Sequence, residues 1–141
     1  MIREAKLKDA KDLSSLMNTL GYPSSEEEMS HRMKRILSKN DYMTYVYEEH
    51  GVCAGMIGMT YSVAYHTDEP HVRVISFVVD ESKQGRGIGR SLMEKAEVWA
   101  KSRNAKTIML NSGNRKERRD THEIYKHYGF NSRATGFYKS L

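Results

Sequence analysis

The sequence of 141 residues has few of the groups that stabilise small secreted or zinc-dependent proteins: it contains one cysteine, Cys53. A single cysteine forms no disulfide within the chain and completes no zinc site built from several cysteines. We therefore expect a reducing compartment, and the cytoplasm is the expected location. Apolar residues and glycines lie close to Cys53 in the sequence, so we expect a buried thiol and not a nucleophile.

The chain also lacks a long apolar run. Its longest stretch of apolar residues and glycines, 51–59, is far shorter than the roughly 20 residues that a membrane-spanning helix needs. Charged residues follow Met1 almost directly, where a secretory signal would turn apolar. With 38% hydrophobic residues and only 2 prolines, the composition is that of a folded protein without membrane association.

The length suits one domain, so we expect residues 1–141 to form a single domain. Lysine and arginine number 23 against 18 aspartates and glutamates, which gives a net charge of +5. A positive charge favours a phosphorylated cofactor, an acidic partner or a nucleic acid. The excess is modest for a nucleic-acid-binding protein and does not choose among these partners.

The first 40 residues predict a short strand and two helices. Residues 1–5 suit an edge strand, and apolar residues recur at helical spacing over 9–20 and again from Met29 onward. Gly21 ends the first helix, whereas Ser25 followed by glutamate three residues later predicts a capping box at the start of the second. The second helix is expected to end near Lys39.

From residue 41 the pattern changes, and strands are expected over 41–49, 52–65 and 71–79. The two-residue connection 50–51 favours an antiparallel hairpin. An amphipathic helix and a short strand at 107–110 follow the third of these strands, which makes 71–79 and 107–110 parallel. The expected fold class is α/β with a mixed sheet, in which antiparallel strands precede a βαβ crossover. A short helix through Tyr128 and a closing segment complete the chain.

A glycine-rich turn, Gln84-Gly85-Arg86-Gly87-Ile88-Gly89, connects the strand 71–79 to the long helix. Unpaired N–H groups and the positive end of the helix dipole converge at such a turn, and glycine lets a phosphate approach the main chain. The turn is not a P-loop, since no Gly-Lys-Ser/Thr follows, and its glycines lack the order found in dinucleotide folds. The sequence therefore predicts an anion-binding turn.

This turn resembles the Gln/Arg-x-x-Gly-x-Gly/Ala pyrophosphate motif of the GCN5-related N-acetyltransferases, and as in that family it follows a strand end, here residues 77–80. The later segment 124–130, Ile-Tyr-Lys-His-Tyr-Gly-Phe, is similar to the family's Phe-Tyr-x-x-x-Gly-Phe pattern. The order of elements also agrees through to the last strands. The resemblance implies acetyl-CoA as co-substrate and a sheet whose two parallel strands splay apart.

The resemblance also implies roles for individual residues. The main chain of the strand end pairs with the pantetheine arm of acetyl-CoA, and the glycine turn with Arg90 binds the pyrophosphate. Tyr125 faces the sulfur and protonates the departing thiolate as general acid. Asn111 contacts the cofactor or the acceptor. The expected cofactor-binding residues are Phe77, Val78, Val79, Gln84, Gly85, Arg86, Gly87, Ile88, Gly89, Arg90, Asn111 and Tyr125.

The sequence departs from the family pattern in two places. Arg118 stands where many members have an asparagine that contacts the cofactor arm. Ile75 and Ser76 stand where some relatives have a carboxylate base, so the general base is unassigned. The nearest candidates for the base are His66, Asp68, Glu69 and His71.

Three further features of the sequence bear on other functions. His122 and His127 stand five residues apart and not four, so no metal site is expected. The basic cluster 115–119 suits a solvated loop, the phosphates of the cofactor or a nucleic acid. The acids 26–28 suit either a helix start favoured by its dipole or a wall that attracts a cationic acceptor.

We therefore expect an acetyl-CoA-dependent N-acetyltransferase that acts on a primary amine of a small molecule, by direct attack in a ternary complex. The alternatives are a protein or peptide amine as acceptor, a non-catalytic acyl-CoA-binding module, and a basic nucleic-acid-associated protein, which is the least favoured. The oligomeric state stays open, and a homodimer is one expectation because dimers are common among similar proteins.

Overall fold

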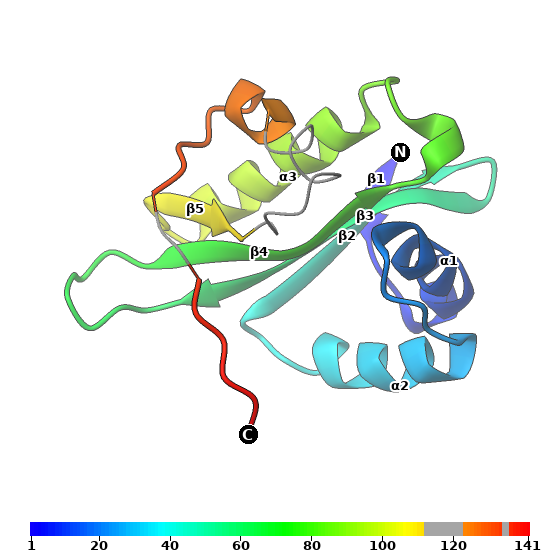
Figure 1. The fold of residues 1–141 in the computed structure, drawn as a ribbon, viewed down its shortest axis with the longest axis horizontal. Coiled ribbons are helices and arrows are strands. Elements are labelled where there is room, and N and C mark those ends of the chain that lie inside the picture. Colours follow the sequence, from blue (N-terminus) through cyan, green and yellow to red (C-terminus); the bar gives the residue numbers. More distant parts are fainter. Residues whose placement is uncertain (112–122, 134–135) are drawn as a thin grey trace.

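The computed structural model describes residues 1–111, 123–133 and 136–141. Within these residues one mixed sheet has the strand order β1-β2-β3-β4-β5, with α3 on one face and α1 and α2 on the other (Figure 1). The strands are β1 (Ile2–Glu4), β2 (Tyr42–Glu49), β3 (Val52–Ser62), β4 (His71–Val79) and β5 (Thr107–Leu110). The helices are α1 (Ala10–Leu20), α2 (Glu26–Leu37) and α3 (Ile88–Ser102), with 3₁₀ turns η1 (Leu7–Asp9) and η2 (Glu81–Lys83).

The sheet topology confirms the expected mixed α/β class. The strands β1 to β4 pair antiparallel in chain order, whereas β4 and β5 are parallel and connected through α3. The hairpin between β2 and β3 turns through His50 and Gly51, both with positive φ, as a two-residue connection requires. The capping box at Ser25 is also confirmed, with Glu28 as its second member.

Two boundaries differ from the sequence expectations by two or more residues. β3 ends at Ser62 and not at Tyr65, because Ser62 already lies opposite His71, the first residue of β4. α2 ends at Leu37, before the expected limit near Lys39. Residues 136–141, part of the expected closing segment, carry no strand and expose the side chains of Phe137 and Tyr138.

Apolar side chains form a core on each face of the sheet, since residues along each strand alternate between the two faces. On one face α3 packs on β2, β3 and β4 through fully buried residues such as Leu92 and Met93. Gly55 of β3 permits this close packing, because a Cβ there would lie 3.1 Å from Leu92 Cδ1 and 3.2 Å from the Val78 carbonyl oxygen. The buried side of α3 agrees with its predicted apolar stripe.

An ion-pair network ties the N-terminal strand to the helical face. Arg3 donates to both carboxylate oxygens of Asp9, at 2.9 and 2.8 Å, and to Glu48 at 3.2 Å. Asp9 also accepts the Lys6 N–H at 2.7 Å and is only 5% exposed. The Arg3 guanidinium holds the pKa of Asp9 below its usual value, although burial acts in the opposite direction.

Asp9→Asn is expected to destabilise the protein at pH 7 by about 3 kcal/mol, because it leaves a partly buried guanidinium without its main partner. The folded-state pKa of Asp9 lies below the unfolded value, so its stabilisation is present above the unfolded pKa and is lost as the pH falls through the folded pKa. Melting temperatures between pH 7 and pH 3 should therefore fall less steeply in the variant. The exposed Asp41→Asn serves as control, and an equal acid slope for wild type and Asp9→Asn would contradict this role.

Gly55→Ala is expected to destabilise the fold by about 1–3 kcal/mol, since the added methyl group meets both a main-chain oxygen and the buried side chain of Leu92. Gly58→Ala, also on β3, is the matched control because its Cβ has no neighbour closer than 3.6 Å, at Met56 Cε. Urea unfolding compares the two variants. Equal losses would show that α3 does not depend on the close approach at Gly55.

Candidate active site

The parallel pairing between β4 and β5 stops halfway along β4. Paired residues run from His71 with Thr107 to Val74 with Leu110, where β5 ends. On the other side of β4 the register with β3 shifts at the same point and leaves Ile75 without a partner on β3. Such a bulge bends a strand and increases its twist. Among the described residues, the second half of β4 thus has β3 on one side and no parallel neighbour on the other.

The main chain of this half-strand faces the open side at alternate residues. The Asp80 N–H donates to the Ala54 carbonyl of β3 at 2.8 Å. Because antiparallel strands exchange hydrogen bonds at every second residue, Val78 also directs its N–H and C=O toward β3. Phe77 and Val79 therefore direct their main-chain groups to the side where β5 has ended. An extended ligand can form hydrogen bonds along this edge.

The glycine turn follows directly and leads into α3. Gly85 and Gly87 have φ of 80° and 83°, a conformation that side chains with a Cβ rarely adopt. Gly87 is the N-cap residue of α3, and no described side chain caps this end by a hydrogen bond. The first turn of α3 also contains no acid, whereas that of α2 holds three glutamates. The α3 N-terminus thus keeps its affinity for an anion.

The space around the turn is compatible with a bound pyrophosphate. A Cβ placed at Gly85 or Gly87 would have no atom within 4 Å, so the main chain there is open to a ligand. Gly89 is different, since a Cβ there would lie 3.2 Å from the Tyr128 hydroxyl and 3.5 Å from Phe77 Cζ. The open edge and the open turn together fit the pantetheine and pyrophosphate parts of acetyl-CoA.

An aromatic cluster joins the segment 123–130 to the open edge. Phe77 lies 6.4 Å from Tyr125 and 6.5 Å from Tyr128 between ring centroids, and Tyr125 lies 6.2 Å from Phe130. Gly129, with φ of 94°, ends the short helix 123–127, and the Phe130 N–H then donates to the Tyr125 carbonyl at 3.1 Å. The predicted tyrosine is thereby placed beside the predicted strand end.

Tyr128 is a member of this cluster that sequence reasoning did not assign. Its ring lies 5.6 Å from the Arg90 guanidinium, and burial raises the pKa of its hydroxyl. It holds Arg90 and the first turn of α3 against the segment that carries Tyr125. Tyr128 stands three residues after the tyrosine of the recognised segment, but spacing alone gave no sign that it reaches α3.

The polar side chains of the turn are occupied by protein partners. Gln84 Nε2 donates to the Val79 carbonyl at 3.3 Å. Arg86 donates to both oxygens of Glu49, at 3.1 and 2.9 Å, and the Glu49 carboxylate also lies 3.4 Å from Lys83 Nζ. These cations hold the pKa of Glu49 below its usual value, with Arg86 as the larger cause. Ligand contacts in the turn therefore depend on its main chain.

The remaining predicted site residues lie around this centre. Ile88 is a buried core residue, so any ligand contact must come from its main chain. The prediction that Val78 contacts the cofactor is not supported, because its side chain is buried and its main-chain groups face β3. Asn111 is exposed and follows β5 directly. Arg118, His122 and the basic cluster 115–119 lie outside the described residues.

The candidate bases lie away from the open edge. His66, Asp68 and Glu69 are exposed in the connection before β4, whereas the edge is at the end of that strand. His71 starts β4, so it is six residues, or roughly 20 Å of extended strand, from Phe77. Ser76 is closer, and its buried hydroxyl has no hydrogen-bond partner among the described residues. The general base therefore stays unassigned.

Cys53 is buried, as expected, with 4% of its surface exposed. Burial and the charges of Asp9 and Asp12 raise the pKa of its thiol to about 12. The thiol is therefore protonated at neutral pH and does not serve as a nucleophile.

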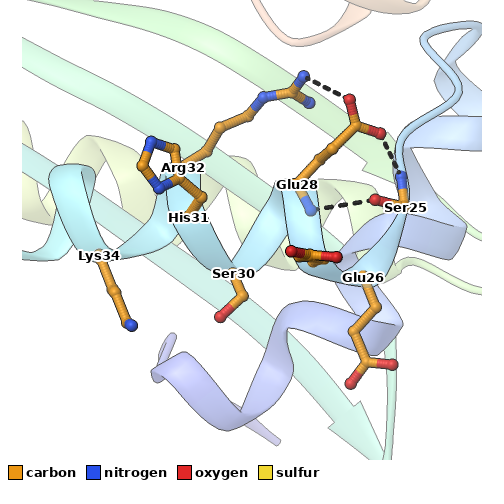
Figure 2. A pocket seen from close by; sticks show the side chains of 8 residues that line it. Ser25, Glu26, Glu28, Ser30, His31, Arg32 and Lys34 are labelled. Carbon is orange, nitrogen blue, oxygen red and sulfur yellow. Dashed lines mark hydrogen bonds and ion pairs between the residues drawn. The ribbon is translucent and has the colours of Figure 1, made fainter.

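Two hollows on the described surface are not lined by the glycine turn. Figure 2 shows the larger one, whose lining residues all come from α2 and its cap, among them Ser25, Glu28 and Arg32. Glu28 is engaged there by Ser25 and Arg32, which favours the helix-start interpretation of the acids 26–28. The smaller one, of about 250 Å³, lies between β1, β2 and the end of α2.

Similar proteins identify the family of this chain. The acetyltransferase (GNAT) family model matches residues 10–130. An uncharacterised N-acetyltransferase of Bacillus subtilis, YhdJ, is 24% identical over 110 residues, covering 78% of this chain and 75% of that protein.

Among solved structures, a GNAT family acetyltransferase from Staphylococcus aureus is 28% identical with a TM-score of 0.85, and the match covers 100% of this chain and 98% of that one. An aminoglycoside 6'-N-acetyltransferase from Acinetobacter haemolyticus shares the fold, with 19% identity, a TM-score of 0.85 and coverage of 100% and 97%. No helix among the described residues is long and apolar enough to cross a membrane. The chain belongs to the GNAT family and is an acetyltransferase.

Proposed function

We propose that the enzyme binds acetyl-CoA along the open edge of β4 and across the glycine turn, and acetylates a primary amine of a small molecule. The observation that carries the proposal is that β5 ends opposite Val74, which, among the described residues, leaves the main chain of Phe77 and the N–H of Val79 available beside Tyr125. When bound, acetyl-CoA supplies the thioester. Val78 contributes indirectly, because its main chain pairs with β3 and keeps the strand in place.

The residues of the turn and of the first α3 turn would hold the pyrophosphate. Main-chain N–H groups of 85–89 converge at a helix N-terminus that lacks its own cap, and Arg90 adds a positive charge held by Tyr128. Gln84 supports the edge through its bond to Val79. Asn111, exposed beyond the end of β5, is available to the cofactor or the acceptor.

The amine nitrogen forms a bond to the acetyl carbon, and the carbon–sulfur bond breaks within the ternary complex. Main-chain donors of the open edge polarise the carbonyl. Tyr125 gives its hydroxyl proton to the departing thiolate. The amine releases one proton to solvent, and Tyr125 takes one proton back from solvent, so the number of protons balances. Cys53 is protonated and buried in the core beneath α1 and α2, which supports direct attack without an acyl-enzyme.

A small-molecule amine is the proposed acceptor, as for the aminoglycoside acetyltransferase that shares this fold. A protein or peptide amine is the second candidate. We also propose that residues 1–141 act as one domain in the cytoplasm. A homodimer stays a prediction.

The function is tested by calorimetry with acetyl-CoA, ATP and a short RNA, followed by release of CoA thiol in the presence of a panel of amines. Binding of acetyl-CoA alone together with amine-dependent thiol release is the expected result. Binding without release for polyamines, amino acids, aminoglycosides and lysine peptides would favour an acyl-CoA-binding module. Salt-sensitive binding of RNA alone would overturn the proposal.

Tyr125→Phe is expected to lower kcat by about a hundredfold, since it removes the proton donor, and to leave the KM for acetyl-CoA within about twofold. Tyr138→Phe is the matched control, because that side chain is 84% exposed. Steady-state kinetics with the best amine of the panel provide the measurement. An unchanged kcat for Tyr125→Phe at all pH values would exclude the general-acid role.

A further inference from the structure

Glu49 connects the β2–β3 hairpin to the glycine turn. It is the last residue of β2, and its carboxylate accepts hydrogen bonds from both terminal guanidinium nitrogens of Arg86, at 3.1 and 2.9 Å. The same carboxylate lies 3.4 Å from Lys83 Nζ, at the end of η2. Lys83 and Arg86 flank Gln84 and Gly85, so one carboxylate holds the first half of the turn from both sides.

The turn has few other attachments among the described residues. Gly85 and Gly87 have no atom within 4 Å of a potential Cβ, so packing does not restrain them. Glycine loses more conformational freedom on ordering than any other residue. The bond from Gln84 to Val79 and the first α3 bond, from the Ser91 N–H to the Gly87 carbonyl at 3.0 Å, are local to the segment. Among the described residues, Glu49 therefore attaches residues 83–86 to a distant part of the chain, whereas Ile88 and Gly89, at the other end of the turn, are held by the core and by Tyr128.

We infer that Glu49 is a positioning residue for acetyl-CoA binding: it holds Arg86 and Lys83 so that the N–H groups of the glycine turn are ordered before the pyrophosphate arrives. The inference rests on the proposed function of the turn. Glu49 does not touch the ligand, and it acts through Arg86. The bidentate geometry also means that the Arg86 guanidinium serves the turn and not the pyrophosphate.

Two effects of removing the Glu49 charge oppose each other. Loss of the ion pairs releases the turn and weakens binding of the pyrophosphate, whereas loss of a negative charge reduces repulsion of the phosphates. Arg86 and Lys83 already offset the charge of the partly exposed Glu49 carboxylate, and the Debye length at 0.15 M salt is about 8 Å, so its net repulsion of the phosphates is small. We expect release of the turn to dominate.

The test compares CoA with pantetheine, which lacks the pyrophosphate and the nucleotide. Titration calorimetry at 0.15 M salt should show that Glu49→Gln raises the Kd of CoA about tenfold and leaves the Kd of pantetheine within about twofold. Glu81→Gln is the matched control, because Glu81 is an exposed acid of η2 and its loss removes the same charge. This control should leave both dissociation constants within about twofold.

Two further variants separate anchoring from direct contact. If Arg86 acts through Glu49, Arg86→Gln weakens CoA by the same factor as Glu49→Gln, and the double variant Glu49→Gln/Arg86→Gln is no worse than either. A much larger loss in Arg86→Gln would assign Arg86 directly to the phosphates and overturn the inference. Because exposed ion pairs contribute little to stability, the variants should fold. If Glu49→Gln does not fold, Arg86→Gln removes the same pair and carries the test.

The outcomes distinguish this inference from the proposed function. Equal Kd values of CoA and pantetheine for the wild type would show that the turn does not bind the pyrophosphate, and the proposed function would fail. A wild-type preference for CoA that is undiminished in Glu49→Gln would overturn the role of Glu49 alone. Equal weakening of CoA and pantetheine in Glu49→Gln would indicate a general structural loss and would also overturn it.

Discussion

The short pairing between β4 and β5 is the constraint on which the candidate site depends. In the part of the chain that the structure describes, β4 has a parallel partner only before Ile75, and the bulge at Ile75 bends β4 at the point where β5 ends. A sheet edge exposes N–H and C=O groups that pair with another chain or ligand. Here the unpaired groups belong to a strand that is not at the edge of the sheet, since β4 has β3 on one side and β5 beside its first half.

The rest of the fold holds this edge and the glycine turn in register. Packing of α3 on the sheet requires the close approach at Gly55, and it fixes the helix N-terminus beside the end of β4. The contact of Gly89 with Tyr128 then connects α3 to the aromatic cluster that carries Tyr125. Edge, helix N-terminus and tyrosine therefore come together through contacts between three separate segments of the chain.

The local features of the fold could be predicted from the sequence because their causes are local. Apolar spacing located α3, the serine and glutamate pattern located the capping box at Ser25, and the glycines located the turn. The family resemblance added Tyr125, and the structure places this residue beside Phe77, although no spacing in the sequence determines that contact.

The remaining features depend on pairing between distant residues. The bulge at Ile75 follows from the register of β4 on β3, which no local pattern encodes. The ion pair of Glu49 with Arg86 joins residues 37 positions apart, and the contact of Tyr128 with Gly89 depends on the path of the chain between them. The end of β3 at Ser62 likewise depends on where β4 begins opposite it, and apolar and tyrosine residues alone extended the expected strand to Tyr65.

The central claim is that the main chain of the second half of β4 and of the glycine turn binds acetyl-CoA. Amide hydrogen exchange measured by mass spectrometry, with and without CoA, tests it most directly, because it reports on main-chain N–H groups. The account predicts slower exchange in peptides covering 76–79 and 85–90, with little change in β1 and α2. Unchanged exchange at 76–79 and 85–90 under saturating CoA would contradict it.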